Sequence, residues 1–278
     1  MSTLAHSTIA AEGETPTAWL YVLHGIFGAG RNWASVARRL VERCPEWGVE
    51  LVDLRGHGRS QGFGPPHTVA AAADDVAALL RATGRRARAV LGHSFGGKVA
   101  LVLARDHAHE AGLAQLWIVD SLPAPVPEPQ GDAWAMLGIL RRHPGPFADR
   151  GEALAALAAE GVASGVAQWV STNLEPTPDG ADAASGPLRW RLDLDAMEAL
   201  LRDFFAADLW DVVERPPDDL RIHFVRASRS SVMPPAIADR ILRIGRANGR
   251  VELHTVVGGH WLNADNPGAM IDLLAEHL

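Results

Sequence analysis

Hydrophobic runs and amphipathic segments alternate along most of the chain. Short apolar runs bounded by turn residues predict buried strands, and longer segments with apolar residues three or four positions apart predict helices packed on them. The expected strands are Trp19–Leu23, Val49–Leu54, Ala87–Leu91, Leu116–Val119, Ile222–Ala227 and Val251–Val256, with a weaker strand or hairpin at Leu4–Ala11. The expected helices are Trp33–Arg43, Val69–Ala82, Gly96–His107, Pro235–Ile244 and Pro267–His277. This order predicts an α/β fold, a mostly parallel sheet with helices on both faces.

The alternation breaks between Asp120 and about Pro217, where a proline-rich stretch and helical stretches such as Gly151–Trp169 replace the strands. We expect residues 121–217 to form an inserted helical cap over the carboxyl ends of the strands, where open α/β sheets place their sites. Residues 1–120 and 218–278 would form the core, and Glu175–Gly186 a flexible loop within the cap.

Ser94 stands at the centre of a G-x-S-x-G pentapeptide between a predicted strand and a predicted helix. A sharp turn there lifts the serine oxygen above the sheet, and the flanking glycines are needed because a Cβ atom would clash. The start of the helix directs backbone N–H groups toward the place where negative charge would form. This placement, more than the pentapeptide itself, predicts that Ser94 is a nucleophile.

A serine nucleophile needs a base to remove its proton and an acid to orient that base. His260 follows the last predicted strand after two glycines that permit a tight turn, which favours it as the base. The loop after Ile222–Ala227, a common position for the acid, contains no carboxylate. Asp120 ends the preceding strand, level with Ser94, and is the expected acid, although an aspartate here is also a common turn former.

The oxyanion of the intermediate should be held by two backbone N–H groups. One is expected from Phe95 and the other from the loop H-G-I-F-G, with Ile26 preferred over Phe27. We expect His24 to brace this loop by hydrogen bonds and His93 to pack behind the serine. Asp53 and His57, in the turn D-L-R-G-H-G-R-S at 53–60, are expected to be structural.

Five residues are candidates for lining a substrate pocket: Trp134, Leu137, Trp169, Arg189 and Trp261. Arg189 or its neighbour Arg191 could bind a carboxylate or phosphate of the substrate. The alternative, which we prefer, is that these arginines lie on the surface and pair with Asp193 or Asp195. Apolar cap residues can likewise serve only to hold the cap helices together.

Composition limits the possible partners of the chain. It has 278 residues, 47% of them hydrophobic, and 26 basic against 33 acidic residues give a net charge of −7. No basic run suggests nucleic-acid binding, no window is long enough for a membrane span, and no leader peptide is evident. The single cysteine, Cys44, fits a reducing cytoplasm. The 12 histidines are scattered, so we expect no metal. We also expect no cofactor and a cytoplasmic monomer or homodimer.

The motifs together resemble the α/β-hydrolase family, over roughly Trp19–Asp120 and Leu220–Leu278. They are H-G-I-F-G at 24–28, D-L-R-G-H-G-R-S at 53–60, G-H-S-F-G-G-K-V-A at 92–100 and G-G-H-W-L-N-A-D-N-P at 258–267. In the cap, V-A-Q-W-V-S-T-N-L at 166–174 and L-R-W-R-L-D-L at 188–194 are similar to small bacterial esterases and thioesterases whose acid follows the sixth core strand. This resemblance implies hydrolysis of acyl esters or thioesters through an acyl-enzyme. Because the cap is short and its candidate helix Gly151–Trp169 is dominated by alanine, we expect small or medium-sized acyl substrates.

Other activities share the same serine, histidine and acid. Cofactor-free haloperoxidases or perhydrolases, carbon–carbon bond hydrolases and lyase-like menaquinone-pathway enzymes stay open, as does a ligand-binding receptor with slow hydrolysis. Relatives that cleave halides or epoxides use an aspartate where this chain has Ser94, which counts against both reactions.

Overall fold

A seven-stranded sheet forms the centre of the protein, whose computed structural model describes residues 3–177 and 186–278. The strand order is β1-β3-β2-β4-β5-β8-β9, with β1 antiparallel to β3 and every other neighbouring pair parallel. The strands are β1 (His6–Ile9), β2 (Ala18–Leu23), β3 (Trp47–Val52), β4 (Ala87–His93), β5 (Gln115–Val119), β8 (Arg221–Ala227) and β9 (Val251–Val256). The predicted α/β fold is confirmed, and the six stronger strand predictions are correct to within two residues.

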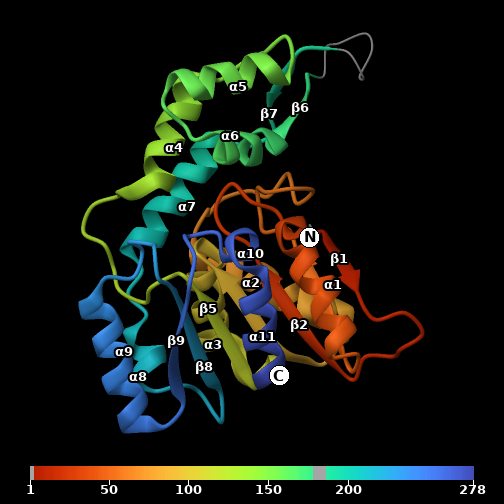
Figure 1. Ribbon diagram of the computed structural model, residues 1–278, viewed down its shortest axis with the longest axis vertical. Coiled ribbons are helices and arrows are strands. Elements are labelled where there is room, and N and C mark those ends of the chain that lie inside the picture. Colours follow the sequence, from red (N-terminus) through yellow and green to blue (C-terminus); the bar gives the residue numbers. More distant parts are fainter. Residues whose placement is uncertain (1–2, 178–185) are drawn as a thin grey trace.

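Helices cover both faces of the sheet (Figure 1). One face packs on α1 (Ala34–Arg43) and α11 (Pro267–His277); the other packs on α2 (Val69–Thr83), α3 (Phe95–Ala111), α8 (Trp210–Glu214) and α9 (Pro235–Asn248). Successive strand residues point to opposite faces, so Leu20 and Val22 join the first layer while Tyr21 and Leu23 join the second. Two short helices, η1 (Gly30–Trp33) and α10 (Leu262–Asp265), complete the core.

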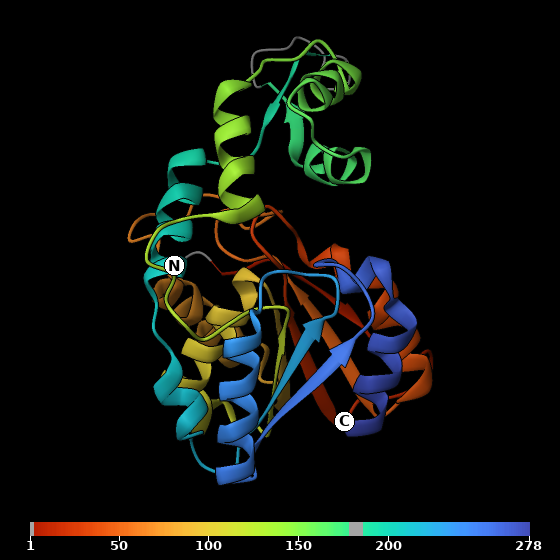
Figure 2. The ribbon, with the colours of Figure 1, turned by 60° about the vertical axis from the view of Figure 1, so that its left-hand side comes forward.

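The segment between β5 and α8 lies over the carboxyl ends of the strands, as Figure 2 shows. It contains α4 (Gly131–Arg142), α5 (Arg150–Ala159), α6 (Ser164–Val170), η2 (Ser171–Asn173), β6 (Leu174–Pro176), β7 (Leu188–Trp190) and α7 (Leu194–Ala206). We call the segment 131–206 the cap; the exact division of the chain at residues 120 and 218 stays a prediction.

Two details of the cap differ from the sequence-based expectation. The expected helix Gly151–Trp169 is two helices, α5 and α6, because the chain leaves helical geometry near Gly161, whose φ is +79°. Glu175 and Pro176, expected in a loop, belong to β6, which pairs antiparallel with β7. Most of that expected loop, residues 178–185, lies outside the described residues.

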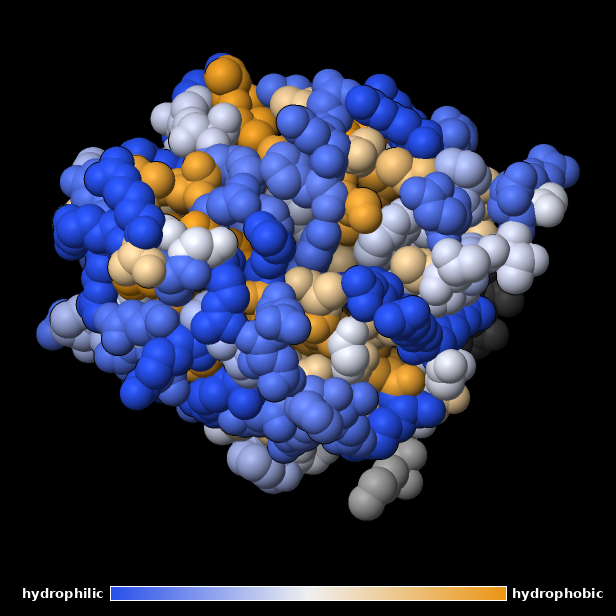
Figure 3. Space-filling model, turned by 90° about the horizontal axis from the view of Figure 1, so that it is seen from below, coloured by the Kyte–Doolittle hydropathy of each residue, from blue (hydrophilic) through white to orange (hydrophobic). Residues whose placement is uncertain are grey.

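Three further features concern the helices, the single cysteine and the surface. Among the helices formed by residues 3–177 and 186–278, none combines the length and apolar character needed to cross a membrane. Cys44 is buried at the end of α1. On the face seen in Figure 3, hydrophilic side chains predominate, and the hydrophobic areas are small and separated.

Candidate active site

Ser94 occupies a strained turn between β4 and α3. Its φ is +52° and its ψ −115°, and its N–H donates to the Val119 carbonyl at 2.9 Å. The neighbouring glycines make the turn possible. A Cβ atom on Gly92 would clash with the Gly96 carbonyl oxygen, and one on Gly96 would lie 2.5 Å from the Leu23 carbonyl oxygen. The G-x-S-x-G pattern is therefore a packing requirement at this position.

Asp120 and His260 meet directly, although 140 residues separate them in the sequence. His260 Nδ1 donates to Asp120 Oδ2 at 2.7 Å, and the other carboxylate oxygen accepts the Ala227 N–H at 3.1 Å. Asp120 is fully buried and has a φ of +42°. With its proton on Nδ1, His260 retains Nε2 as the atom that can accept a proton. The loop after β8, which lacks a carboxylate, supplies a backbone N–H that orients the carboxylate of Asp120.

His93 links the elbow to the loop that carries His260. Its Nε2 donates to the His260 carbonyl at 2.8 Å, and the two ring centroids are 4.8 Å apart. Complete burial lowers the pKa of His93 to about 3, so this imidazole stays neutral. A Cβ atom on Gly25 would lie 3.3 Å from both His93 Nδ1 and Ser94 Cβ, so the loop at Gly25 passes close to both side chains.

The loop expected to form the oxyanion hole is held from two sides. His24 donates from Nδ1 to the Gly25 carbonyl at 2.7 Å and accepts the Leu54 N–H at Nε2 at 3.0 Å, which confirms its expected bracing role. From the cap, Asn173 Nδ2 donates to the Phe27 carbonyl at 2.8 Å.

The candidate N–H donors of this hole are available. Within residues 3–177 and 186–278, the amides of Ile26, Phe27 and Phe95 donate no hydrogen bond. Phe27 has a φ of +60°. Because the amides of both residues are free in the described part of the chain, the preference for Ile26 over Phe27 stays a prediction.

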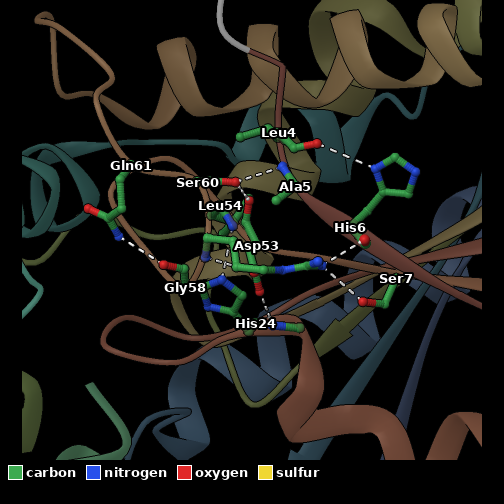
Figure 4. Close-up of polar contacts among 12 residues, drawn as sticks. Leu4, Ala5, His6, Ser7, His24, Asp53, Leu54, Gly58, Ser60 and Gln61 are labelled. Atoms are coloured by element: carbon green, nitrogen blue, oxygen red, sulfur yellow. Dashed lines mark hydrogen bonds and ion pairs between the residues drawn. The ribbon is translucent and has the colours of Figure 1, made fainter. Parts of the chain in front are cut away.

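The turn at 53–60 forms the structural network drawn in Figure 4. Asp53 accepts the Gly30 N–H at 2.8 Å and the Arg59 N–H at 3.0 Å through its two carboxylate oxygens. Ser60 Oγ donates to the Asp53 carbonyl at 2.7 Å and accepts the Ala5 N–H at 2.8 Å. All these contacts are local to the turn or join it to Ala5, just before β1, and to η1, which supports the structural role expected of Asp53.

Lys98 is a residue whose importance the sequence reasoning missed. It is fully buried in α3, and its Nζ donates to the carbonyls of Ala124, Phe204 and Ala207 at 2.9, 2.6 and 2.8 Å. Burial lowers the pKa of Lys98 to about 8. The Phe204 ring lies 4.8 Å from Nζ and 6.0 Å from the Phe95 ring. Lys98 thus fastens the two chain segments that lead into and out of the cap next to the elbow. A lysine within the apolar first half of α3 was the available signal.

The five candidate pocket residues do not all gather at one place. Trp169 of the cap lies 5.6 Å from Trp261, whose ring lies 5.9 Å from that of His260. Trp134 packs edge-on against Phe205, and Leu137 is buried in the same hydrophobic cluster. The structure therefore brings Trp169 and Trp261 together beside His260, whereas Trp134 contacts α7.

The expected partners of the cap arginines were wrong. Arg189, whose side chain is exposed, and Arg191 both pair with Glu175, at 3.1 and 2.9 Å. This happens because β6 and β7 pair antiparallel and place Glu175 opposite Arg189. Asp193 instead caps α7, and Asp195 pairs with Arg141.

Comparison with known proteins agrees with this architecture. A family model described as "alpha/beta hydrolase fold" matches residues 18–137. The sn-1-specific diacylglycerol lipase ABHD11 of Mus musculus is 26% identical over 273 residues, which are 96% of this chain and 83% of that protein. A putative carbamate hydrolase RutD of a Caulobacter species is 38% identical over 104 residues, 37% of each chain.

Solved structures extend the match to the whole chain. A structure described as a marine microorganism esterase aligns over 100% of both chains with a TM-score of 0.83 and 23% identity. An E-2-(acetamidomethylene)succinate hydrolase aligns over 98% of this chain and 94% of its own, with a TM-score of 0.73 and 19% identity. The topology, the elbow and these matches show that the chain has the α/β-hydrolase fold.

Proposed function

We propose that this protein is a serine hydrolase that cleaves carboxylic esters or thioesters. The observation that carries the proposal is the Asp120–His260 hydrogen bond of 2.7 Å, formed at the same edge of the sheet as the strained turn of Ser94. Chain order then runs nucleophile, acid, base, as in other enzymes of this fold.

The reaction follows from the proton positions. His260 Nε2 takes the Ser94 hydroxyl proton as Oγ attacks the carbonyl carbon, and Asp120 stabilises the imidazolium that forms. The Phe95 amide and that of Ile26, or Phe27 in its place, hold the oxyanion. His260 then protonates the departing alcohol or thiol, which leaves an acyl group on Ser94. Water activated by the same histidine releases the acid and restores the enzyme.

Two observations bear on the substrate class: an aromatic pair beside His260 and the names of two relatives. The pair Trp169 and Trp261 beside His260 would give the acyl group an aromatic surface. The relatives named as a diacylglycerol lipase and an esterase act on acyl esters by name, which supports an ester substrate. We infer small to medium-sized acyl substrates, with the cap covering the site.

The rival function is a binding protein with slow hydrolysis, and turnover separates the two. With p-nitrophenyl acetate or butyrate, we expect steady multiple turnover that Ser94→Ala abolishes and Ser164→Ala, a change at an exposed serine of α6, preserves. A single burst of about one product per protein, followed by no further turnover, would favour the binding protein. Turnover that survives in Ser94→Ala would remove Ser94 from the mechanism.

A further inference from the structure

Four possible metal ligands converge at one edge of the sheet, on β8, β9 and α11. His223 Nδ1 lies 3.2 Å from His254 Nε2 and 3.8 Å from Glu252 Oε2. Glu252 Oε2 is also 3.7 Å from His254 Nε2 and 4.0 Å from His277 Nε2. One ligand atom from each residue lies within 4.8 Å of all the others.

The sheet register explains this convergence. In the parallel pair β8–β9, His223 stands opposite Glu252, and Val225 stands opposite His254. Glu252 and His254 are two positions apart, so both side chains leave β9 on the same face. The last turn of α11 brings His277 over that face. Histidines that are scattered along the sequence are therefore gathered in space, which sequence spacing alone did not predict.

The separations suit a small tetrahedral ion. Zinc bonds of about 2.0–2.1 Å to nitrogen place neighbouring ligand atoms of a regular tetrahedron about 3.3 Å apart. The separations run from 3.2 Å to at most 4.8 Å, so the more distant ligand atoms must move closer together to reach that arrangement when the ion binds. Three imidazoles and one carboxylate are a donor set that zinc accepts.

Surrounding contacts already orient two of the rings. His277 Nδ1 donates to the Leu273 carbonyl at 2.9 Å, which leaves Nε2 free to bind a metal. The Trp117 ring stacks on His223 at 4.2 Å with an interplanar angle of 11°.

We propose that His223, Glu252, His254 and His277 bind one Zn²⁺ ion with all four positions filled by the protein. Such a closed site is structural, because catalytic zinc keeps a position for water or substrate. It would fasten the edge strand β9 and the last turn of α11 to β8. His223 is the third residue of β8, whereas Ala227, which contacts Asp120, is the last. The zinc site is therefore separate from the catalytic residues.

The test uses the untagged full chain after treatment with a chelator. Zn²⁺ is titrated against a chromophoric competitor, and thermal unfolding is followed with Zn²⁺ or with Mg²⁺ as control. We expect one zinc bound per chain with micromolar or tighter affinity, and a rise in Tm of roughly 5 °C or more at saturation. Magnesium should give no rise, because it prefers six oxygen ligands.

Matched variants show whether these residues bind the ion. His254→Gln and His277→Gln, both at partly exposed positions, should lose the zinc-dependent rise in Tm and the tight binding. His109→Gln, a change at an exposed histidine of α3, should retain both. Cobalt should give the intense visible absorption of a tetrahedral site in the parent protein only. Absence of zinc binding, or full binding in His254→Gln, would overturn the proposal.

Discussion

At the scale of single residues, Asp120 is fixed by two hydrogen bonds with different consequences. Asp120→Asn can keep an oxygen acceptor for the Ala227 N–H, but its amide group cannot accept the His260 Nδ1 proton. We expect ester turnover to fall by about 10⁴, the scale of losing the correct histidine tautomer, with little change in Tm. Asp53→Asn is the control, and it should lower Tm more than turnover because Asp53 accepts two backbone N–H groups. Near-normal turnover in Asp120→Asn would mean that another group orients His260.

His57 makes folding stability depend on pH. It is fully buried, and burial lowers its pKa from 6.5 to about 3. Between these values the unfolded chain binds a proton that the folded protein does not, so stability is lost as pH falls below 6.5. We expect His57 to remove about 2 kcal/mol of the free energy of unfolding between pH 6.5 and pH 5. Urea unfolding across this range should show that the free energy of unfolding depends less steeply on pH in His57→Asn than in His109→Asn. Equal slopes in the two variants would contradict this assignment.

The residue-level site was partly predictable. Ser94 and His260 stand in local motifs, and Asp120 follows from the missing carboxylate after β8. The partners of Asn173 and Lys98 could not be predicted, because Phe27 and Phe204 lie 146 and 106 residues away. Contacts of this kind appear only when the cap is placed over the core.

At the scale of elements, the elbow depends on contact between β4 and α3. Gly92→Ala would force a Cβ atom into the Gly96 carbonyl, so we expect it to lower Tm strongly and to reduce turnover. Gly165→Ala, in α6, meets no atom within 4 Å and should leave Tm unchanged or raise it slightly. Thermal unfolding of the two variants compares them directly. A Gly92→Ala protein as stable as its parent would show that the elbow can relax.

The strands were easier to predict than the cap. Core strands are buried on both faces, which produces continuous apolar runs that sequence patterns detect. In the cap, β6 and β7 have three residues each and pair with one another, so their sequences show no such run. The break between α5 and α6 depends on the conformation of one glycine, Gly161. The register of the β6–β7 pair also places Glu175 opposite Arg189, and the sequence alone could not indicate this ion pair.

At the scale of the whole molecule, the cap is joined to the core by specific contacts. Asn173 bonds to Phe27, and Arg31 donates to the Thr172 carbonyl at 3.0 Å. The helices α5 and α6 are short and rich in alanine, glycine and serine, whereas opening at a lipid surface needs an amphipathic lid. We therefore expect no jump in activity as a short- or medium-chain ester passes its micellar concentration. A sharp rise at that threshold would contradict this expectation and indicate a lipase.

The central claim is that Ser94 becomes covalently acylated with the help of His260 and Asp120, and a fluorophosphonate probe tests it most directly. Intact-protein mass spectrometry should find one adduct per folded chain, and peptide mapping should place it on Ser94. Ser94→Ala should stay unlabelled, and Asp120→Asn should react far more slowly than Ser164→Ala. A folded parent protein that remains unlabelled, or an adduct that persists in Ser94→Ala, would contradict the account.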